Sequence, residues 1–211
     1  MTEVYVVDLE TTGLGGCPVD HAVDVGLVNV DLTRETVSTV FTTVIGYDTS
    51  EWDDLHRNAW IFNHTDLTLD KVDSIKAERP LERVRSTLIE ILHGQNLTSY
   101  NTSFDLDKFL FRAPWDLSGI VNRYPCLMMS AAAPCKLEGR TFWTHADETT
   151  PSMGKYHPPK LSYAYETLCP DDPAHIKGKQ THRALSDAHV AGHLLLAMHK
   201  TGFYPDMAVS P

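Results

Sequence analysis

The segment VYVVDLE at residues 4–10 most constrains the fold of this chain. Residues 4–9 predict a β-strand that is apolar on both faces, and such a strand must be covered on both sides, as the central strand of an α/β sheet is. Two acids, Asp8 and Glu10, stand at the end of this strand with one leucine between them. Because side chains along a strand alternate between the two faces of a sheet, both carboxylates point to the same side.

The rest of the chain predicts a mixed α/β sheet. Residues 22–32 and 35–46 alternate apolar and polar side chains on either side of a polar turn, which predicts a β-hairpin. Residues 52–76 are helical in pieces, with Asp66 as an N-cap, and residues 96–100 predict a short strand. Apolar spacing predicts further helices over residues 80–94, 104–113, 161–168 and 182–200. This order of elements indicates one α/β domain over residues 1–211, with an irregular insertion at about 136–160.

The net charge of the chain limits the kinds of partner that it can bind. Its 18 basic and 28 acidic residues leave a formal net charge of −10. A protein that coats duplex DNA needs a wide basic surface, which this balance does not favour. The composition fits a protein that binds cations, or one that contacts a short piece of nucleic acid through bound metal.

The four cysteines show no CxxC spacing, which predicts reduced thiols in a cytoplasmic protein. The first ten residues carry no basic region typical of a signal peptide. Apolar runs stay well below the roughly 18 residues that cross a bilayer, so no membrane partner is predicted. Two metal sites are less favoured alternatives: one shared by Cys126 and Cys135, which a disulfide between them would replace, and a zinc ion held by His189 and His193.

Four acids occupy comparable places at the ends of predicted elements. Asp8 and Glu10 end the first strand, Asp105 stands where a short strand passes into a helix, and Asp187 stands near the start of the last helix. Like charges this close repel each other unless a cation neutralises them, and a hard divalent ion, Mg²⁺ or Mn²⁺, suits oxygen ligands. The alternative for Asp8 and Glu10 is that both carboxylates are simply exposed to solvent at a strand-to-turn junction. Ligand binding at strand carboxyl ends in open α/β sheets favours the metal site.

A histidine, His182, precedes Asp187 by five positions. On one continuous helix the two side chains would lie about 140° apart, since each residue turns the helix by about 100°. To act together with Asp187, His182 must therefore lie in the approach to the helix. An exposed histidine in that position is well suited to carry protons.

Three segments, in this order, resemble the three motifs of the DEDDh, or DnaQ-like, 3′–5′ exonucleases of the RNase H-like superfamily. They are DLETTGL at 8–14, NTSFD at 101–105 and HRALSD at 182–187. The sister DEDDy branch has a tyrosine where this chain has Arg183, so the resemblance is to the histidine branch. Within it, the carboxyl end is most similar to exonuclease X-type enzymes. Asp24 stands where many relatives have glutamate, a departure predicted to lie near no motif.

The resemblance implies an RNase H-like fold with a mixed five-stranded sheet flanked by helices. It also implies a phosphodiester hydrolase that releases nucleoside monophosphates from 3′ ends with two divalent ions, Mg²⁺ or Mn²⁺. In this sequence the residues that would hold the ions are Asp8, Glu10, Asp105 and Asp187. The general base would be His182.

The resemblance further implies a set of substrate-binding residues, which are Thr11, Thr12, Gly13, Leu14, Asn101 and Phe104. The first three let the backbone approach the terminal nucleotide, and Leu14 is the wedge against the last bases. Asn101 and Phe104 line the same end pocket, although plain core packing is an equal alternative for Phe104. Trp143, in the insertion, is a further candidate for substrate contact.

Several functions stay open at this point. The favoured substrate is a single-stranded or frayed DNA 3′ end. Alternatives are an enzyme that acts on RNA or short oligoribonucleotides, and a proofreading subunit of a DNA polymerase. A non-catalytic module that only binds nucleic-acid ends is the third possibility, and the complete set of four acids and a histidine counts against it.

Overall fold

Five strands form one mixed sheet in the part of the chain that the computed structural model describes, which is residues 3–137, 156–172 and 181–204. The strand order is β3-β2-β1-β4-β5, so the predicted central strand, β1 (Glu3–Thr11), is central. Strands β2 (Ala22–Asp31) and β3 (Thr36–Val44) form the predicted antiparallel hairpin beside it. On its other side, β4 (Asn96–Ser99) and the short β5 (Asn122–Arg123) run parallel to it.

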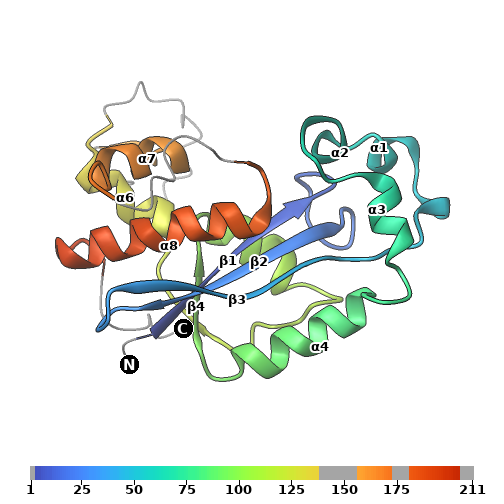
Figure 1. Cartoon of the computed structure of the whole chain (residues 1–211), viewed down its shortest axis with the longest axis horizontal. Helices are drawn as coiled ribbons and strands as arrows, with labels where there is room; N and C mark the ends of the chain where they lie inside the picture. The colour runs from blue at the N-terminus through green and yellow to red at the C-terminus, as the bar shows by residue number, and fades with distance from the viewer. Residues whose placement is uncertain (1–2, 138–155, 173–180, 205–211) are drawn as a thin grey trace, which may run out of the picture.

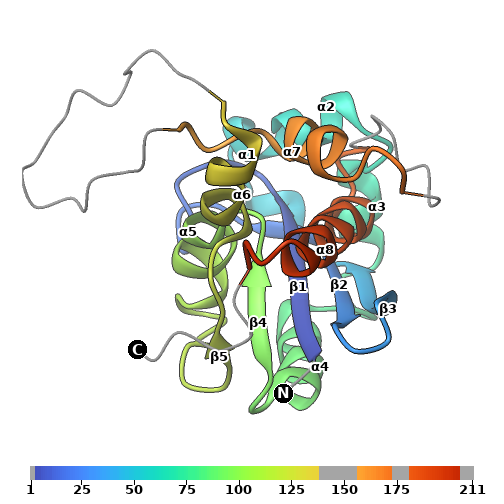
Figure 2. The ribbon, with the colours of Figure 1, turned by 90° about the vertical axis from the view of Figure 1, so that its left-hand side faces the viewer.

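Helices cover both faces of this sheet, as the apolar β1 sequence predicts. Figure 1 shows α6 (Leu127–Cys135), α7 (Leu161–Leu168) and α8 (Ala184–Lys200) above the sheet and α4 (Leu81–Leu92) below it. The view in Figure 2 places α8 beside β1 and β2. Alternate valines of β1 pack into the two layers: Val4 and Val6 face α8, whereas Val7 faces α4. Full burial of each valine contributes roughly 1.5–3 kcal/mol to folding.

The helix predicted over residues 104–113 differs from the structure in type and in length. A short α5 (Thr102–Phe104) is followed by a π-helix, η2 (Asp105–Leu110). The Phe111 amide donates to the Leu106 carbonyl at 2.8 Å, which is the five-residue spacing of a π-turn. Apolar spacing does not distinguish the two helix types here, because the six residues of η2 make fewer than two turns of either helix.

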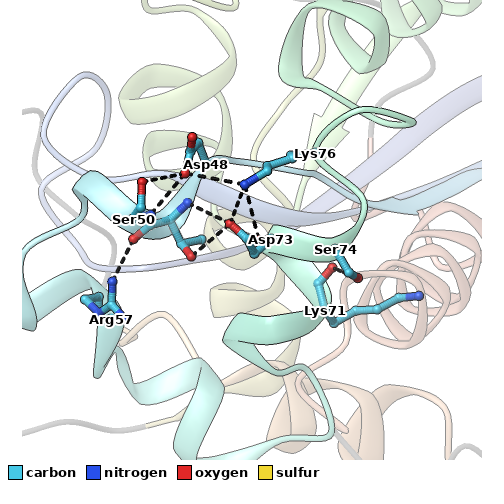
Figure 3. Close-up of polar contacts among 8 residues, drawn as sticks. Asp48, Ser50, Arg57, Lys71, Asp73, Ser74 and Lys76 are labelled. Atoms are coloured by element: carbon cyan, nitrogen blue, oxygen red, sulfur yellow. Dashed lines mark hydrogen bonds and ion pairs between the residues drawn. The ribbon is translucent and has the colours of Figure 1, made fainter.

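A chain of short helices connects β3 to α4: η1 (Thr49–Glu51), α1 (Asp54–Arg57), α2 (Trp60–His64) and α3 (Leu69–Ser74). Figure 3 shows polar contacts that join its two ends, where Lys76 Nζ lies 3.5 Å from Asp48 and 3.1 Å from Asp73. The Thr49 amide also donates to Asp73 Oδ1 at 3.2 Å. Apolar residues of α2 and α3 pack on Val23 and Val44 at the sheet edge. The predicted N-cap at Asp66 is wrong, because the Thr68 hydroxyl caps α3.

Gly26 of β2 lets the start of α8 lie directly on the sheet. A Cβ at this position would stand 2.3 Å from the backbone of Ala184 and Leu185. We expect Gly26→Ala to push the first turn of α8 off the sheet and to cost about 1–3 kcal/mol, the usual range for overpacking. In a domain of this size each kcal/mol lowers the melting temperature by about 2–4 °C. Thermal unfolding measures this loss.

The matched control for that substitution is Gly119→Ala, because a Cβ on Gly119 meets no atom within 4 Å. Its melting temperature is expected to stay within a degree or so of the wild type, since surface changes are usually within about 0.5 kcal/mol. Equal melting temperatures for the two variants would show that α8 yields without cost at Gly26.

Two further sequence predictions, on the cysteines and on membrane spans, can be compared with the structure. All four cysteines are free thiols, as predicted. No helix within the described residues has the length and apolarity that a membrane span requires. Most of the predicted insertion, residues 138–155 with Trp143, lies outside the described residues.

Candidate active site

One cavity of about 440 Å³ at the end of β1 contains all five residues of the predicted catalytic set. Strand β1 supplies Asp8 and Glu10, the π-helix η2 begins with Asp105, and α8 carries Asp187 in its first turn. The loop before α8 supplies His182. Segments that are far apart in the sequence thus converge on one cavity.

Strand geometry explains how the acids meet. Asp8 and Glu10 follow Val4 and Val6 on the alternation that faces α8, the helix that carries Asp187. Strands β1 and β4 are parallel, so their carboxyl ends lie at the same edge and Asp105 enters just beyond β4. The Leu9 amide donates to Asp105 Oδ1 at 3.3 Å, which ties this acid to β1.

His182 lies in the approach to α8, as its spacing from Asp187 predicts, because the helix begins only at Ala184. Its backbone is left-handed, with a φ of 49°. The imidazole meets the Trp60 ring edge-on, with 4.9 Å between ring centroids. Ligand atoms of Glu10, His182 and Asp187 lie within 4.8 Å of one another.

No protein-family model matches this sequence, and no curated protein matches it. The structure, however, is similar to solved structures. A full-length 3′-exonuclease has a TM-score of 0.62 and 17% identity, with 99% of this chain and 67% of that chain covered. The nuclease domain of 3′hExo, a DEDDh family member bound to rAMP, has a TM-score of 0.60 and 15% identity, with 99% and 98% covered. The chain has the fold of the DEDDh exonucleases. Cell-death related nuclease 4 also shares the fold at 11% identity, with a TM-score of 0.51 over 96% of this chain and 65% of that one.

The acids of this exonuclease fold resist ionisation. Burial raises the pKa of Asp8 well above its usual value, and the neighbouring Asp105 and Glu10 raise it further. Burial, followed by the charge of Asp187, raises the pKa of Glu10 to about 8. Burial also raises the pKa of Asp105 to about 7 and that of Asp187 to about 6. Such a cluster takes up protons near neutral pH unless another cation replaces them.

The donor set fits a divalent cation. Among the described residues, Glu10, His182 and Asp187 are the group whose ligand atoms gather closely enough to share an ion. Asp187 Oδ1 is buried and has no hydrogen-bond partner in the described part of the chain. A buried carboxylate oxygen of this kind is costly unless a cation or a donor satisfies it. The predominance of carboxylate oxygens favours Mg²⁺ or Mn²⁺ over softer metals.

The predicted substrate-binding residues divide into two groups. Asn101 and Phe104 line the cavity, and Phe104 also packs on Phe109 with 5.2 Å between ring centroids. The position of Phe104 in the cavity lining is consistent with substrate binding, and its contact with Phe109 is consistent with core packing.

The other group, Thr11 to Leu14, is not among the residues that line this cavity; it begins at the last residue of β1 and continues into the turn after the strand. Thr11 Oγ1 donates to the Gly13 carbonyl at 2.8 Å, and Thr12 Oγ1 accepts from the His21 amide at 2.9 Å. Leu14 is 76% exposed.

Sequence reasoning missed several residues of this region. The prediction that Asp24 lies near no motif is wrong, because Asp24 pairs with Glu10 across β1 and β2 and accepts a hydrogen bond from Arg183. One signal for it was present, namely an acid in a stretch, residues 22–28, that otherwise holds only apolar residues and a glycine. Trp60, which contacts His182, carried no such signal. The cavity is also lined by residues outside the motifs, which are Tyr100, Met128, Pro158, Pro159, Lys160 and Leu161.

Proposed function

We propose that this protein is a metal-dependent 3′–5′ exonuclease, which hydrolyses the terminal phosphodiester bond of a nucleic acid and releases nucleoside monophosphates. The observation that supports this most is the convergence of all three motifs on one cavity. That cavity contains the four acids together with His182. The fold of the DEDDh exonucleases supports the same proposal.

The four acids and His182 each have a role in this proposal. Asp8, Glu10, Asp105 and Asp187 hold two divalent ions. When bound, the ions neutralise the acids and stabilise the charge that develops on the scissile phosphate. His182 lies beside Glu10 and Asp187 and takes the proton from the attacking water. Charge neutralisation by the ions also explains how a chain with a net charge of −10 accepts a phosphate.

DNA with a single-stranded or frayed 3′ end is the proposed substrate. RNA is the second candidate, because the 3′hExo nuclease domain, which shares this fold, is bound to rAMP. The 2′-hydroxyl is the group by which a protein tells the two apart. A comparison of matched DNA and RNA strands therefore decides the substrate.

The test uses the purified protein and 5′-labelled strands: single-stranded DNA, blunt duplex DNA and single-stranded RNA of one sequence. With Mg²⁺ or Mn²⁺ we expect a ladder that shortens from the 3′ end, and EDTA should stop it reversibly. A terminal phosphorothioate at the 3′ end should delay the ladder, whereas one at the 5′ end should not. Binding without cleavage under every condition would favour the end-binding module and reject the proposed activity.

Leu14 gives a sharper prediction on the same substrates. Its side chain is exposed on the turn after β1, and its carbonyl accepts from Lys108 Nζ at 2.7 Å, which holds the turn in place. A wedge helps most when the end is paired, because unpairing a terminal base costs a few kcal/mol. We expect Leu14→Ala to slow cleavage of blunt duplex by up to about tenfold, equivalent to about 1.4 kcal/mol, with single strands little changed.

Val19→Ala is the matched control for Leu14→Ala, since Val19 lies in the same turn region and is 65% exposed. Its ratio of duplex to single-strand rates should equal that of the wild type. If Leu14→Ala and Val19→Ala gave the same ratio, a different residue would have to open the paired end.

A further inference from the structure

The residue after the predicted general base, Arg183, is held by two acids from different parts of the fold. Its Nε donates to Asp24 Oδ2 at 2.8 Å, and its NH1 donates to Asp66 Oδ1 at 2.9 Å. The Asp24 side chain on β2 is only 2% exposed, while that of Asp66, before α3, is 76% exposed. The guanidinium thus spans from the sheet to the short-helix segment, with its stronger anchor on the buried side.

Asp24 also fixes the start of α8. Arg183 is the N-cap residue of this helix and makes no cap hydrogen bond with its own side chain. The Ala184 amide donates to Asp24 Oδ2 at 3.3 Å, so the acid from β2 takes the role of the cap. One carboxylate oxygen therefore holds both the last residue before the helix and the first residue in it.

The backbone of His182 needs such support. A φ of 49° is left-handed, a conformation that is unfavourable for a residue with a Cβ and persists where neighbours enforce it. On one side the constraint is Arg183. On the other side the Trp60 ring meets the imidazole, and Trp60 is itself stacked on His64 with 4.8 Å between ring centroids.

The residues that hold Arg183 and His182 in place lie in or beside buried segments of the fold. Asp24 lies in the middle layer, in a strand whose residues are almost all buried. Trp60 and Asp66 flank the buried side chains of Ile61 and Leu67, which pack with Val23 and Val44 at the sheet edge. The bridge made by Arg183 therefore connects the buried strand β2 to the short-helix segment that packs at the sheet edge.

We propose that Arg183 is a positioning residue, which holds His182 in its left-handed conformation against Trp60 and directs the imidazole into the cavity. Arg183 does not line the cavity, so it acts through its neighbour and not on the substrate. The inference rests on the proposed role of His182 as the general base. The experiment below is arranged so that the two ideas fail separately.

The test compares kcat and KM for the wild type and for Arg183→Ala, each also in a His182→Ala background. We expect Arg183→Ala to lower kcat at least about tenfold with KM within about twofold, because a misplaced base loses part of its roughly 10²–10⁴-fold contribution. In the His182→Ala background the same change should have no further effect, since residues that act as a unit are not additive. Arg183→Lys, with one ammonium in place of a two-armed donor, should give an intermediate kcat.

Arg34→Ala is the matched control. Arg34 makes a single ion pair with Asp31 at 3.4 Å, at the far end of β2, and should leave kcat unchanged. If Arg183→Ala is too unstable to assay, Asp66→Asn replaces it, because Asp66 is an exposed carboxylate. We expect Asp66→Asn to lower kcat about two- to fivefold. In the His182→Ala background this loss should be absent.

The outcomes separate the two ideas. A wild-type protein without nuclease activity would reject the proposed function, and the inference with it. If His182→Ala is impaired while Arg183→Ala matches Arg34→Ala, the general base stands and the positioning role is wrong. A loss of kcat that persists undiminished in the His182→Ala background would also overturn it, because Arg183 would then act by another route.

Discussion

Asp105→Asn is expected to abolish 3′-end cleavage while making the metal-free protein more stable. The amide has the shape of the carboxylate and still accepts from the Leu9 amide, so the fold is kept. It lacks the charge with which, in the proposed function, the acid cluster holds a cation. We expect a loss of at least roughly 10²–10³-fold in rate, the scale of one well-placed electrostatic group. Initial rates on 5′-labelled single strands, with Mg²⁺ in excess, measure it.

The gain in stability follows from the raised pKa values of the cluster. A buried acid whose pKa is raised from about 4 to about 7, as that of Asp105 is, binds a proton in the folded state that the unfolded chain has released. Without metal, the stability of the wild type should therefore fall as pH rises from about 4 to about 8, as the cluster ionises. Asp105→Asn should lessen that fall and melt a few degrees higher at pH 8, since about 1 kcal/mol corresponds to about 2–4 °C.

Thermal unfolding in EDTA between pH 5 and pH 8 tests this stability prediction, and added Mg²⁺ should raise the melting temperature of the wild type most at high pH. Asp107→Asn is the matched control on the same π-helix, because Asp107 is half-exposed and pairs with Arg123. It should not gain stability. If the melting temperatures of the wild type and of Asp105→Asn changed with pH to the same extent, ionisation of the buried acids would not destabilise the fold as inferred.

His182→Ala should lose roughly 10²–10⁴-fold in rate, the usual contribution of a well-placed base, while binding divalent metal almost normally. The reason is that Mg²⁺ prefers the carboxylate oxygens, which this change leaves in place.

Calorimetric titration with Mn²⁺ and initial rates with Mg²⁺ in excess check both parts of the histidine prediction. His189→Ala is the control, because His189 lies on α8 and bonds Thr39 at 2.8 Å instead of lining the cavity. Wild-type rates for His182→Ala, or a failure that came entirely from lost metal binding, would contradict the general-base role.

Local pattern was enough to predict much of this fold and the composition of its candidate site. The β1 strand, the hairpin after it, α4 and α7 follow from apolar spacing. The place of His182 follows from helix geometry once His182 and Asp187 are taken to act together. What the patterns missed depends on tertiary contact. Arg183 bonds Asp24 and Asp66 across 159 and 117 positions, and no local spacing encodes such a bridge. The two-residue β5 is likewise too short to leave a signal of its own.

The alternation that places Asp8 and Glu10 beneath α8 also protects the protein from misassembly. Asp8 pairs opposite Gly26 and Glu10 opposite Asp24. Sliding β1 by one residue along β2 would exchange the two faces of the strand. Both acids would then enter the apolar layer packed on α4, and Val7 and Leu9 would replace them in the cavity. Chains with that slip would bury two charges in hydrocarbon and lack the cluster entirely, so wrongly paired chains are both unstable and inert, and a partly folded population should show no stray nuclease activity.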